Sequence, residues 1–351
     1  MFIRNDWYIA AWSHEVQGGK PLARTICNEN VVLFRDAVGK AAALEDRCSH
    51  RGAPLSCGEV VPEGLQCGYH GLVFSAEGKC VYVPGQSNIP PRAHVKGFPL
   101  VEQDEFLWIW MGEPAKADPA KIVPYPWNND HKNWPHKPEH YHVECNFVLL
   151  VDNLMDLTHL GYVHKGTIGG NPKVHVEAKM DVARTENGVK YTRWMLGSVP
   201  PPTYVKAVGF KGLVDRWQEF EFFAPGAIHQ WSGATDAGTG AYEGKREGGF
   251  SLRLYHGITP ETERTSHYFW AGANGYRQDD PSATEQLYQE LSTAFKQDLA
   301  IVAAQQRTLD HYKTVPYVDI KADGARVHAR RVLERRMAEE AGKAPAPLET
   351  A

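Results

Sequence analysis

Two short loops in the N-terminal third of the chain each offer one cysteine and one histidine. Cys48-x-His50 is followed, after a gap of sixteen residues, by Cys67-x-x-His70. Thiolates and imidazoles are ligands of zinc and of iron–sulfur centres, and glycines in and beside both loops let the backbone turn tightly around a metal. The two loops therefore predict a metal site, and the fold has to bring them face to face.

Two kinds of metal centre fit these four ligands. Zinc accepts two Cys and two His tetrahedrally, but zinc fingers usually group the two thiolates in one pair and the two imidazoles in another. A [2Fe–2S] centre of the Rieske type needs two thiolates on one iron and two imidazoles on the other. Because each loop supplies one Cys and one His, the pattern favours the Rieske centre, an electron carrier, and zinc is the alternative.

The composition is that of an ordinary globular protein. The chain has 351 residues, of which 42% are hydrophobic and 23% charged, enough for one large domain or two smaller ones. Its net charge of -4 gives no reason to expect nucleic acid or a membrane surface as a partner. The N-terminal segment has too short an apolar run for a signal peptide, and no stretch approaches the ~18 apolar residues of a membrane span. We therefore expect a cytoplasmic protein without disulfides, and we expect Cys57, between the two loops, to pack in the interior.

The N-terminal third reads as short strands joined by tight turns. VVLFRD (31–36) and AAALED (41–46) flank a turn that contains glycine, which is typical of a β-hairpin. A second hairpin is predicted around Gly78, and FLWIWMG (106–112) predicts a buried strand. This part of the chain is therefore expected to be all-β.

A proline-rich stretch after Gly112 indicates a domain boundary. We expect one domain over residues 1–118, a second over residues 119–337 and a disordered tail over residues 338–351.

The second domain combines helical and strand patterns. Residues 145–164 have apolar residues at helical spacing, and residues 174–270 alternate like strands. A long amphipathic helix is predicted from Ala283 to about Tyr312.

Two acids and two histidines lie within thirteen residues of the first of these helices, in the sequence DNLMDLTHLGYVH from Asp152 to His164. His159 and His164 are five residues apart, which places them about 140° apart on an ideal helix. They can face one ion only if the helix ends or loosens between them, and Gly161 lies in that gap. Asp156 precedes His159 by three residues and shares its face. A surface helix with a polar flank is the alternative.

A third ligand is predicted on the long helix. Asp298 falls on the apolar stripe, four residues after Ala294 and four before Val302. A carboxylate in apolar surroundings costs several kcal/mol unless it is paired or binds a cation. Two histidines and one carboxylate form the facial triad of non-haem Fe(II) oxygenases, which leaves positions open for O2. The alternative is a surface acid or an ion pair with a residue such as Arg307.

Taken together, these motifs make the sequence resemble the Rieske non-haem iron oxygenases over nearly its whole length. The matching segments are RNDWYIAAW, CSHRGAPLS, CGYHGLVF, VDNLMDLTHLGYVH and ITPETE. Within that family the chain is most similar to the oxygenase components to which vanillate O-demethylase, dicamba O-demethylase and toluenesulfonate methyl-monooxygenase belong.

The resemblance implies an α+β fold, with an N-terminal all-β Rieske domain and a C-terminal helix-grip-like catalytic domain of antiparallel sheet and helices. It also implies a homotrimer in which the cluster of one subunit lies near the mononuclear iron of its neighbour. It assigns three residues as ligands of that iron: His159, His164 and Asp298. It makes Asp156 the bridge between His159 and His70 of the adjacent subunit, and it places Asn153 beside the iron.

The implied activity is that of the terminal oxygenase component of a multi-component monooxygenase. NAD(P)H would supply electrons through a separate flavin- or ferredoxin-type reductase, and O2 would be the co-substrate. The expected reaction is oxidative demethylation of a methoxylated, vanillate-like aromatic acid, which gives a phenol and formaldehyde. Hydroxylation of an aryl methyl group, N-demethylation and ring hydroxylation are alternatives that use the same iron chemistry. A pure electron carrier and a zinc-stabilised binding protein are alternatives of other classes.

Substrate-binding residues are expected between residues 200 and 260 and at the start of the long helix. Arg253 and His256 are candidates to hold a carboxylate or sulfonate, and Trp231 is a candidate aromatic wall. Side chains three residues apart on a strand point to opposite faces unless a bulge intervenes. We therefore expect only one of Arg253 and His256 to reach the substrate.

Overall fold

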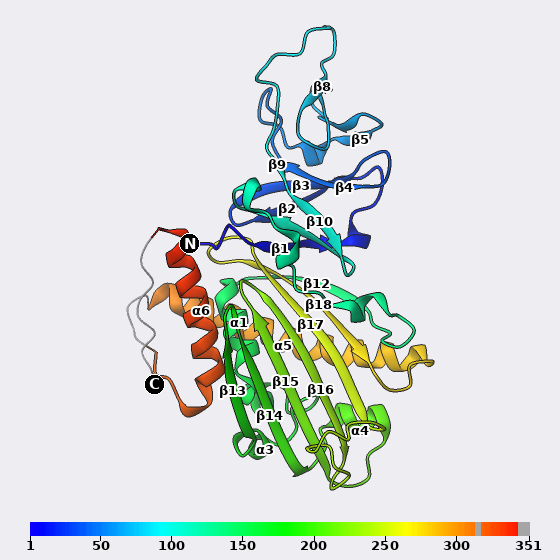
Figure 1. Ribbon diagram of the computed structural model, residues 1–351, viewed down its shortest axis with the longest axis vertical. Coiled ribbons are helices and arrows are strands. Elements are labelled where there is room, and N and C mark those ends of the chain that lie inside the picture. Colours follow the sequence, from blue (N-terminus) through cyan, green and yellow to red (C-terminus); the bar gives the residue numbers. More distant parts are fainter. Residues whose placement is uncertain (313–316, 343–351) are drawn as a thin grey trace. The chain divides into compact units, whose positions relative to one another are not determined.

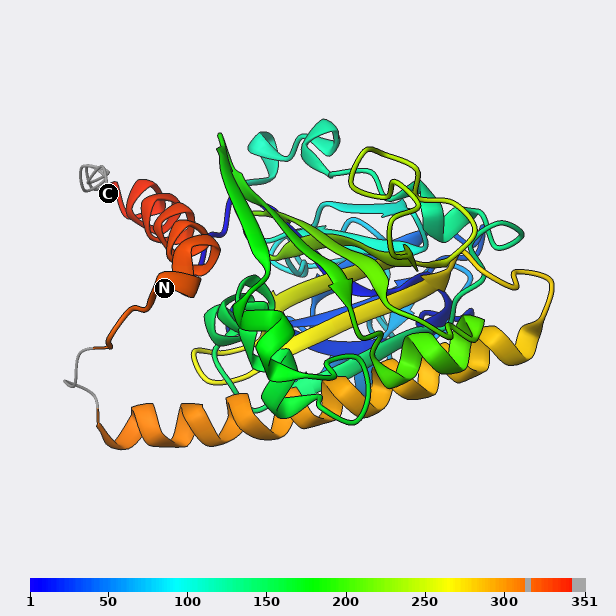
Figure 2. The same cartoon turned by 90° about the horizontal axis from the view of Figure 1, so that it is seen from below.

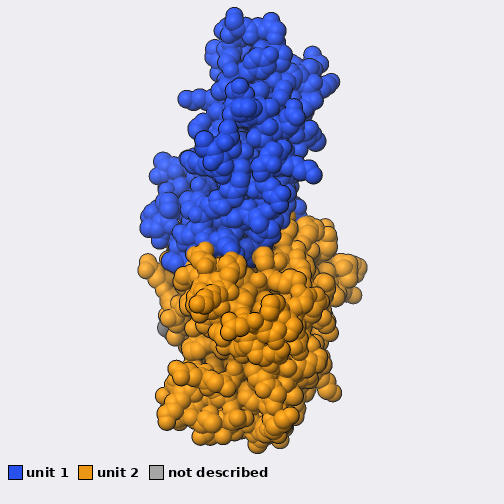
Figure 3. Space-filling view, turned by 90° about the vertical axis from the view of Figure 1, so that its right-hand side faces the viewer, with its two compact units in different colours: residues 1–124, 259–263 blue, residues 125–258, 264–351 orange. Residues whose placement is uncertain are grey.

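The structure, a computed structural model, describes residues 1–312 and 317–342. The chain forms two compact units (Figure 3). These units comprise residues 1–124 with 259–263, and residues 125–258 with 264–351. None of the helices in the described ranges has the length and apolar character needed to cross a membrane.

The first unit extends beyond the boundary that the proline-rich stretch suggested. It runs to Pro124, whereas the sequence placed the boundary after residue 118. The indole Nε1 of Trp7 donates to the carbonyl of Asp118 (2.9 Å), which ties this stretch to the first strand of the unit. The prolines here start short 3-10 turns instead of an extended linker.

Three small antiparallel sheets build the first unit, in agreement with the all-β pattern (Figure 1). Their strand orders are β1-β11-β10, β2-β3-β4-β9 and β5-β6-β7-β8. The strands are β1 (Trp7–Trp12), β2 (Leu22–Ile26), β3 (Glu29–Arg35), β4 (Ala41–Glu45), β5 (Glu59–Val61), β6 (Gly64–Gln66), β7 (Val73–Phe74), β8 (Cys80–Tyr82), β9 (Gly97–Phe98), β10 (Leu100–Gln103) and β11 (Phe106–Trp110). The 3-10 turns are η1 (Ser13–Glu15), η2 (Leu55–Cys57), η3 (Pro114–Lys116) and η4 (Pro119–Lys121). The two predicted hairpins are confirmed as β3–β4 and β7–β8.

The cysteines of the two metal-binding loops belong to a hydrophobic core of the first unit. Cys48 and Cys67 pack with Leu55, Leu65 and Phe74, and all five are buried. The loops are therefore anchored at their thiols by the same apolar contacts that hold the small sheets together.

A seven-stranded antiparallel sheet forms the centre of the second unit, in the order β12-β18-β17-β16-β15-β14-β13. The strands are β12 (Pro138–Val143), β13 (Lys179–Thr185), β14 (Gly188–Ser198), β15 (Val214–Phe223), β16 (Ala227–Asp236), β17 (Phe250–Pro260) and β18 (Ser266–Asn274). The long helix α5 (Pro281–His311) lies along one face of this sheet (Figure 2). Gly272 on β18 permits the close approach, because a Cβ there would lie 2.3 Å from Leu291 Cδ1. The α+β class expected from the sequence is confirmed.

The remaining helices of the second unit are short, apart from the last. They are α1 (Phe147–Met155), α2 (Leu160–Val163), α3 (Pro172–Val176), α4 (Pro202–Val208) and α6 (Gly324–Glu340), with 3-10 turns η5 (Pro126–Asn129), η6 (Leu157–His159) and η7 (Lys321–Asp323). Residues 338–340, which were expected to be disordered, belong to α6. Residues 341–342 form a turn after this helix, and residues 343–351 of the expected tail lie outside the described residues.

Candidate metal centres and substrate cavity

The two Cys–His loops of the first unit have nearly the same backbone geometry. The N–H of Gly52 donates to the carbonyl of Cys48 (2.9 Å), and the N–H of Gly71 donates to the carbonyl of Cys67 (3.0 Å). Both glycines have positive φ, 75° and 73°, which an L side chain rarely adopts. The matching turns place the two cysteines in equivalent positions, whereas His50 and His70 follow their cysteines by two and three residues.

The four side chains divide into a buried pair and an exposed pair. Cys48 and Cys67 are buried, whereas the rings of His50 and His70 are exposed with their centroids 4.6 Å apart. Burial raises the pKa of the Cys48 thiol, and the neighbouring Cys67 thiol raises it further, so a bound cation would favour the thiolate of Cys48. Two thiols on one side and two imidazoles on the other suit the two different irons of a Rieske centre. Cys57, which we expected to pack, is exposed.

In the second unit, the helix that carries the two histidines is interrupted at Asp156. This residue has an extended backbone (φ -128°, ψ 103°), and its carboxylate Oδ1 accepts from the N–H and the hydroxyl of Thr158 (2.9 and 2.7 Å). The chain then restarts as η6 and α2, which ends at Val163, so His164 lies just beyond a helix end. Asp156 therefore acts as a cap that separates α1 from the segment bearing both histidines.

Asp298 lies opposite the two imidazoles. Its Oδ2 is 3.0 Å from His164 Nε2 and its Oδ1 is 3.4 Å from His159 Nε2. Asn153 Nδ2 donates to the same carboxylate (3.1 Å). Asp298 is only 6% exposed, so it is not a surface acid, and its carboxylate contacts these three side chains instead of the Arg307 that the sequence left as an alternative.

The second nitrogen of each imidazole is held by an oxygen. His159 Nδ1 donates to the backbone carbonyl of Asp156 (2.6 Å), and His164 Nδ1 donates to Oε1 of Gln297 (2.9 Å). Each Nε2 can then direct its lone pair towards Asp298, which places three electron-pair donors around one point. This arrangement has the donor set of a two-His, one-carboxylate iron site.

Two details of this site differ from what the sequence and the resemblance suggested. Gln297 was not identified, because an amide next to a buried acid carries no pattern of its own. The hydrogen bond expected between His159 and the Asp156 carboxylate is made instead to the Asp156 carbonyl.

The electrostatics of the two histidines follow from burial and from Asp298. Burial lowers the pKa of His159, and the charge of Asp298 only partly offsets this, so the imidazole is neutral as a metal ligand must be. Burial is the largest single effect on His164 and lowers its pKa, but the hydrogen bond to Asp298, the charge of Asp298 and the hydrogen bond to Gln297 together outweigh it, so the net shift is upward. A metal cation between these groups would replace that proton.

A mostly apolar cavity adjoins this site, between α5 and the inner face of the sheet. His159, His164 and Asp298 form part of its wall. Its apolar lining is Leu154, Leu157, Leu160, Ile168, Phe220, Phe250, Leu252, Leu254, Leu287, Leu291 and Phe295. An apolar cavity with a few convergent polar groups is the usual form of a site for a small aromatic molecule.

Of the three residues expected to contact the substrate, the structure brings only His256 to this cavity. His256 is buried, with Nδ1 2.7 Å from the hydroxyl of Tyr268 and Nε2 2.9 Å from Oε1 of Gln230. Burial lowers its pKa to about 3, so the ring is neutral.

Arg253 and Trp231 lie on the opposite face of the sheet, and neither lines this cavity. They are register partners on β17 and β16, and the guanidinium carbon of Arg253 lies 4.2 Å from the ring centroid of Trp231. The ring of Trp127 lies on the guanidinium as well, at 4.6 Å. The strands continue without a bulge here, so strand alternation separates Arg253 from His256.

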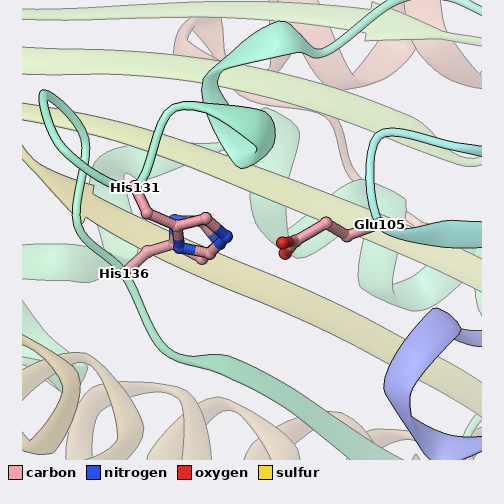
Figure 4. Close-up of side chains that lie close together, drawn as sticks. All are labelled: Glu105, His131 and His136. Carbon is pink, nitrogen blue, oxygen red and sulfur yellow. The ribbon is translucent and has the colours of Figure 1, made fainter.

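Two further histidines of the second unit stack on each other before β12. The rings of His131 and His136 are nearly parallel, with centroids 4.7 Å apart (Figure 4). His136 Nδ1 is also 3.0 Å from the carbonyl of Trp134. Glu105, which Figure 4 also labels, belongs to the β10–β11 turn of the first unit and has a positive φ of 65°. Stacking and the backbone contact account for the orientation of His136 without a ligand.

Models of two domain families match the chain. The Rieske [2Fe-2S] domain matches residues 6–99, and the vanillate O-demethylase oxygenase C-terminal domain matches residues 143–339. The first match includes both Cys–His loops, so it supports their interpretation as ligands of a Rieske cluster and excludes the zinc alternative.

Similar proteins cover nearly the whole chain. The iron-sulfur subunit of the toluene-4-sulfonate monooxygenase system of Comamonas testosteroni is 40% identical over 98% of this chain and 100% of that protein. The vanillate O-demethylase oxygenase subunit of a Pseudomonas species is 37% identical over 99% of this chain and 98% of its own. The oxygenase component of dicamba O-demethylase from Stenotrophomonas maltophilia is 34% identical over 95% and 97%.

Solved structures agree with these matches. Dicamba monooxygenase bound to 3,6-dichlorosalicylic acid has a TM-score of 0.91 at 33% identity, covering 97% of this chain and 99% of that one. A structure of the same enzyme with non-haem iron and dicamba has a TM-score of 0.83 at 32% identity, with the same coverage.

Proposed function

Because the chain belongs to the Rieske oxygenases with a catalytic domain of the vanillate O-demethylase type, we propose that it removes the methyl group from a methoxylated aromatic acid. It is the oxygenase component of a multi-component monooxygenase with a Rieske [2Fe–2S] cluster and a mononuclear iron. The electrons come from a separate reductase, which we propose to be a flavin- or ferredoxin-type protein that uses NAD(P)H.

The observation that carries this proposal is the shared wall of the metal site and the apolar cavity. His159, His164 and Asp298 converge on one point and also line the cavity, so a substrate there lies next to the metal. In this proposal these three residues hold the iron, while Cys48, His50, Cys67 and His70 hold the cluster. When bound, the cluster delivers single electrons and the iron activates O2.

The residues around the metal site keep its ligands in place during turnover. Asn153 donates to the Asp298 carboxylate, and Gln297 accepts from His164 Nδ1. Both contacts limit rotation of a ligand side chain without occupying the metal-facing atom of His164. The apolar residues of α5 and of the sheet exclude water from the rest of the cavity.

A second hollow lies on the side of His159 that faces away from the cavity, and it supports our proposal that electrons arrive from a second subunit. This hollow, lined by Asp152, Asn153, Asp156 and His159, reaches the metal site from that side. We propose that in a homotrimer the cluster-binding His70 of the adjacent subunit docks here, with Asp156 between the two centres.

The proposed reaction consumes one O2 and two electrons per methyl group. One oxygen atom is inserted into a methyl C–H bond of the aryl methyl ether, and the other leaves as water with two protons. The resulting hemiacetal breaks its O–CH2 bond, which gives a phenol and formaldehyde.

Formaldehyde release tests this proposal directly. The holoprotein, a ferredoxin reductase system, NADH and O2 should release formaldehyde from at least one member of a panel of methoxybenzoates. Formaldehyde should equal the phenol formed and should not exceed the O2 consumed. O2 consumption without formaldehyde from any methoxybenzoate would contradict demethylation.

Hydroxylation of an aryl methyl group is the second candidate, because the toluene-4-sulfonate monooxygenase subunit is 40% identical to this chain. The same residues and the same cavity serve this reaction. Benzyl alcohols formed from toluene-4-sulfonate or methylbenzoates, without formaldehyde from the methoxybenzoates, would favour it.

A further inference from the structure

One charged side chain in the cavity wall plays no part in the metal site. Arg216 lies on β15 and lines the same cavity as His159, His164 and Asp298, yet it is only 1% exposed. A guanidinium stays protonated in proteins, so a full positive charge is buried in a cavity that is otherwise mostly apolar.

The charge of Arg216 is only partly compensated within the chain. Its Nη2 donates to the carbonyl of Ile168 (2.9 Å), and its Nη1 makes a longer bond to the carbonyl of Gly169 (3.4 Å). Its Nε is buried and has no hydrogen-bond partner among the residues that the structure describes. No carboxylate within residues 1–312 or 317–342 forms an ion pair with the Arg216 guanidinium. A buried charge without a counter-ion is costly, so this position is suited to an anion supplied from outside.

An aromatic surface lies directly beside this charge. The Arg216 guanidinium carbon lies 4.9 Å from the ring centroid of Tyr204, and the Tyr204 ring stacks on Phe250 at 3.8 Å. Arg216 and Phe250 also lie in the same row of the sheet, since both are aligned with Ala234 of β16. A cation next to stacked rings matches a ligand that combines an aromatic ring with an anionic group.

Neither of the other candidate residues provides such a charge to the cavity. The two ring nitrogens of His256 already contact Tyr268 and Gln230, and its imidazole is neutral. Arg253 is on the other face of the sheet, among tryptophan rings. Among the three, only Arg216 combines a permanent charge with a place in the cavity wall.

We propose that Arg216 binds the carboxylate or sulfonate of an aromatic substrate and so determines which group of the ring faces the metal site. This assignment rests on the oxygenase function proposed above and adds the anchor for the acid group. It makes the enzyme selective for anionic aromatics over neutral ones of the same shape.

Binding measured without turnover tests the assignment. The anaerobic holoprotein is titrated calorimetrically with 3-methoxybenzoate and with the neutral 3-methoxybenzamide. The wild type should bind the acid about 30-fold more tightly than the amide, or roughly 2 kcal/mol, and Arg216→Gln should abolish most of that preference. Arg216→Lys should keep part of it, which guards against misfolding of the first variant. Arg253→Gln, on the opposite face, should keep all of it.

The possible results distinguish the proposed role of Arg216 as the anchor of the acid group from the proposed demethylation. A folded Arg216→Gln protein with both iron centres and an undiminished preference for the acid would overturn the anchor, even if the wild type released formaldehyde. A wild type with no preference for the acid would overturn it too. A wild type that bound the acid through Arg216 but released no formaldehyde would support the anchor and contradict demethylation.

Discussion

Each imidazole at the mononuclear site depends on a residue that does not itself face the metal. Gln297 accepts from Nδ1 of His164, and the Asp156 carbonyl accepts from Nδ1 of His159. These bonds fix both the tautomer and the plane of each ring, which a metal-ligating histidine requires.

Gln297 is the better target for a test, because its contact is made by a side chain. Gln297→Leu should weaken iron binding at the mononuclear site by about 10-fold or more, because the ring of His164 loses its acceptor. Iron retained per chain after dialysis against a chelator measures the effect. The visible spectrum of the cluster, held in the other unit, should not change.

Gln289→Leu is the matched control, since Gln289 lies on the same helix and its side-chain Nε2 donates to the exposed Glu285 (2.8 Å) and not to a histidine. It should retain iron like the wild type. Equal iron retention in the Gln297→Leu and Gln289→Leu proteins would contradict the orienting role of Gln297.

Which residues of the site could be predicted depended on whether each left a pattern in the sequence. Asp298 could be found because a carboxylate interrupts an apolar helical stripe, and it is indeed buried. Arg216 could not, because one cation in an alternating strand does not reveal which face is inward until the register is known. The contact made by Asp156 could not either, because a backbone carbonyl has no sequence signature.

At the scale of elements, the position of His164 depends on how two short helices pack. Gly161 of α2 lies against Pro172, the first residue of α3, and a Cβ at this glycine would lie 2.4 Å from Pro172 Cα. The glycine was expected to loosen the helix, but its role is this close approach between helices.

Gly161→Ala should therefore lower the stability of the second unit, although alanine is the better helix former. A backbone atom blocks the added methyl, so we expect a cost of roughly 1–3 kcal/mol and weaker iron retention as His164 shifts. Thermal unfolding and iron content measure the two effects. Gly166→Ala, with open space around its Cβ position, is the control and should behave like the wild type. A Gly161→Ala protein as stable as this control would contradict the packing argument.

Elements with a regular period were predicted well, and those held by single polar contacts were not. The hairpins and α5 follow from alternation and from an apolar stripe. The helix expected over residues 145–164 is divided because the Asp156 carboxylate caps a new turn. Only Ala325, Ala329 and Leu333 of α6 are buried, and Arg330 pairs with Asp152 of α1, so α6 gives only a weak periodic signal.

At the scale of the whole molecule, long-range backbone contacts decide which residues belong to which unit. Residues 259–263 join the first unit, where the N–H groups of Cys27 and Asn28 donate to the carbonyls of Pro260 and Glu261 (2.9 and 2.8 Å). Backbone pairing between segments so far apart has no side-chain signature, so the sequence predicted neither this return nor the boundary at Pro124.

Three histidines of the second unit predict how stability depends on pH, and of these His175 and His256 are buried and His229 is partly buried. Burial, aided by nearby cations or a histidine, lowers the pKa to about 3 for His175 and His256 and to about 4 for His229. In the unfolded chain the same groups titrate near ~6.5. Below that pH the unfolded state binds more protons, so stability falls as the pH is lowered from ~6.5 towards ~4.

The loss should reach at most about 1.4 kcal/mol per pH unit for each histidine in this window. Denaturation midpoints at pH 7 and pH 5 measure it. His229→Gln, away from the cavity, should reduce the difference between the two midpoints. An unchanged difference would show that His229 is not neutral in the folded protein.

The central claim is that His159, His164 and Asp298 hold an iron that faces the substrate cavity. The most direct test is the EPR spectrum of the anaerobic holoprotein after addition of nitric oxide, with and without 3-methoxybenzoate. The account predicts a high-spin iron–nitrosyl signal that changes on addition of the methoxybenzoate and is missing in Asp298→Ala, while the reduced cluster signal persists. A wild-type protein with an intact cluster but no nitrosyl signal, or an equal signal in Asp298→Ala, would contradict it.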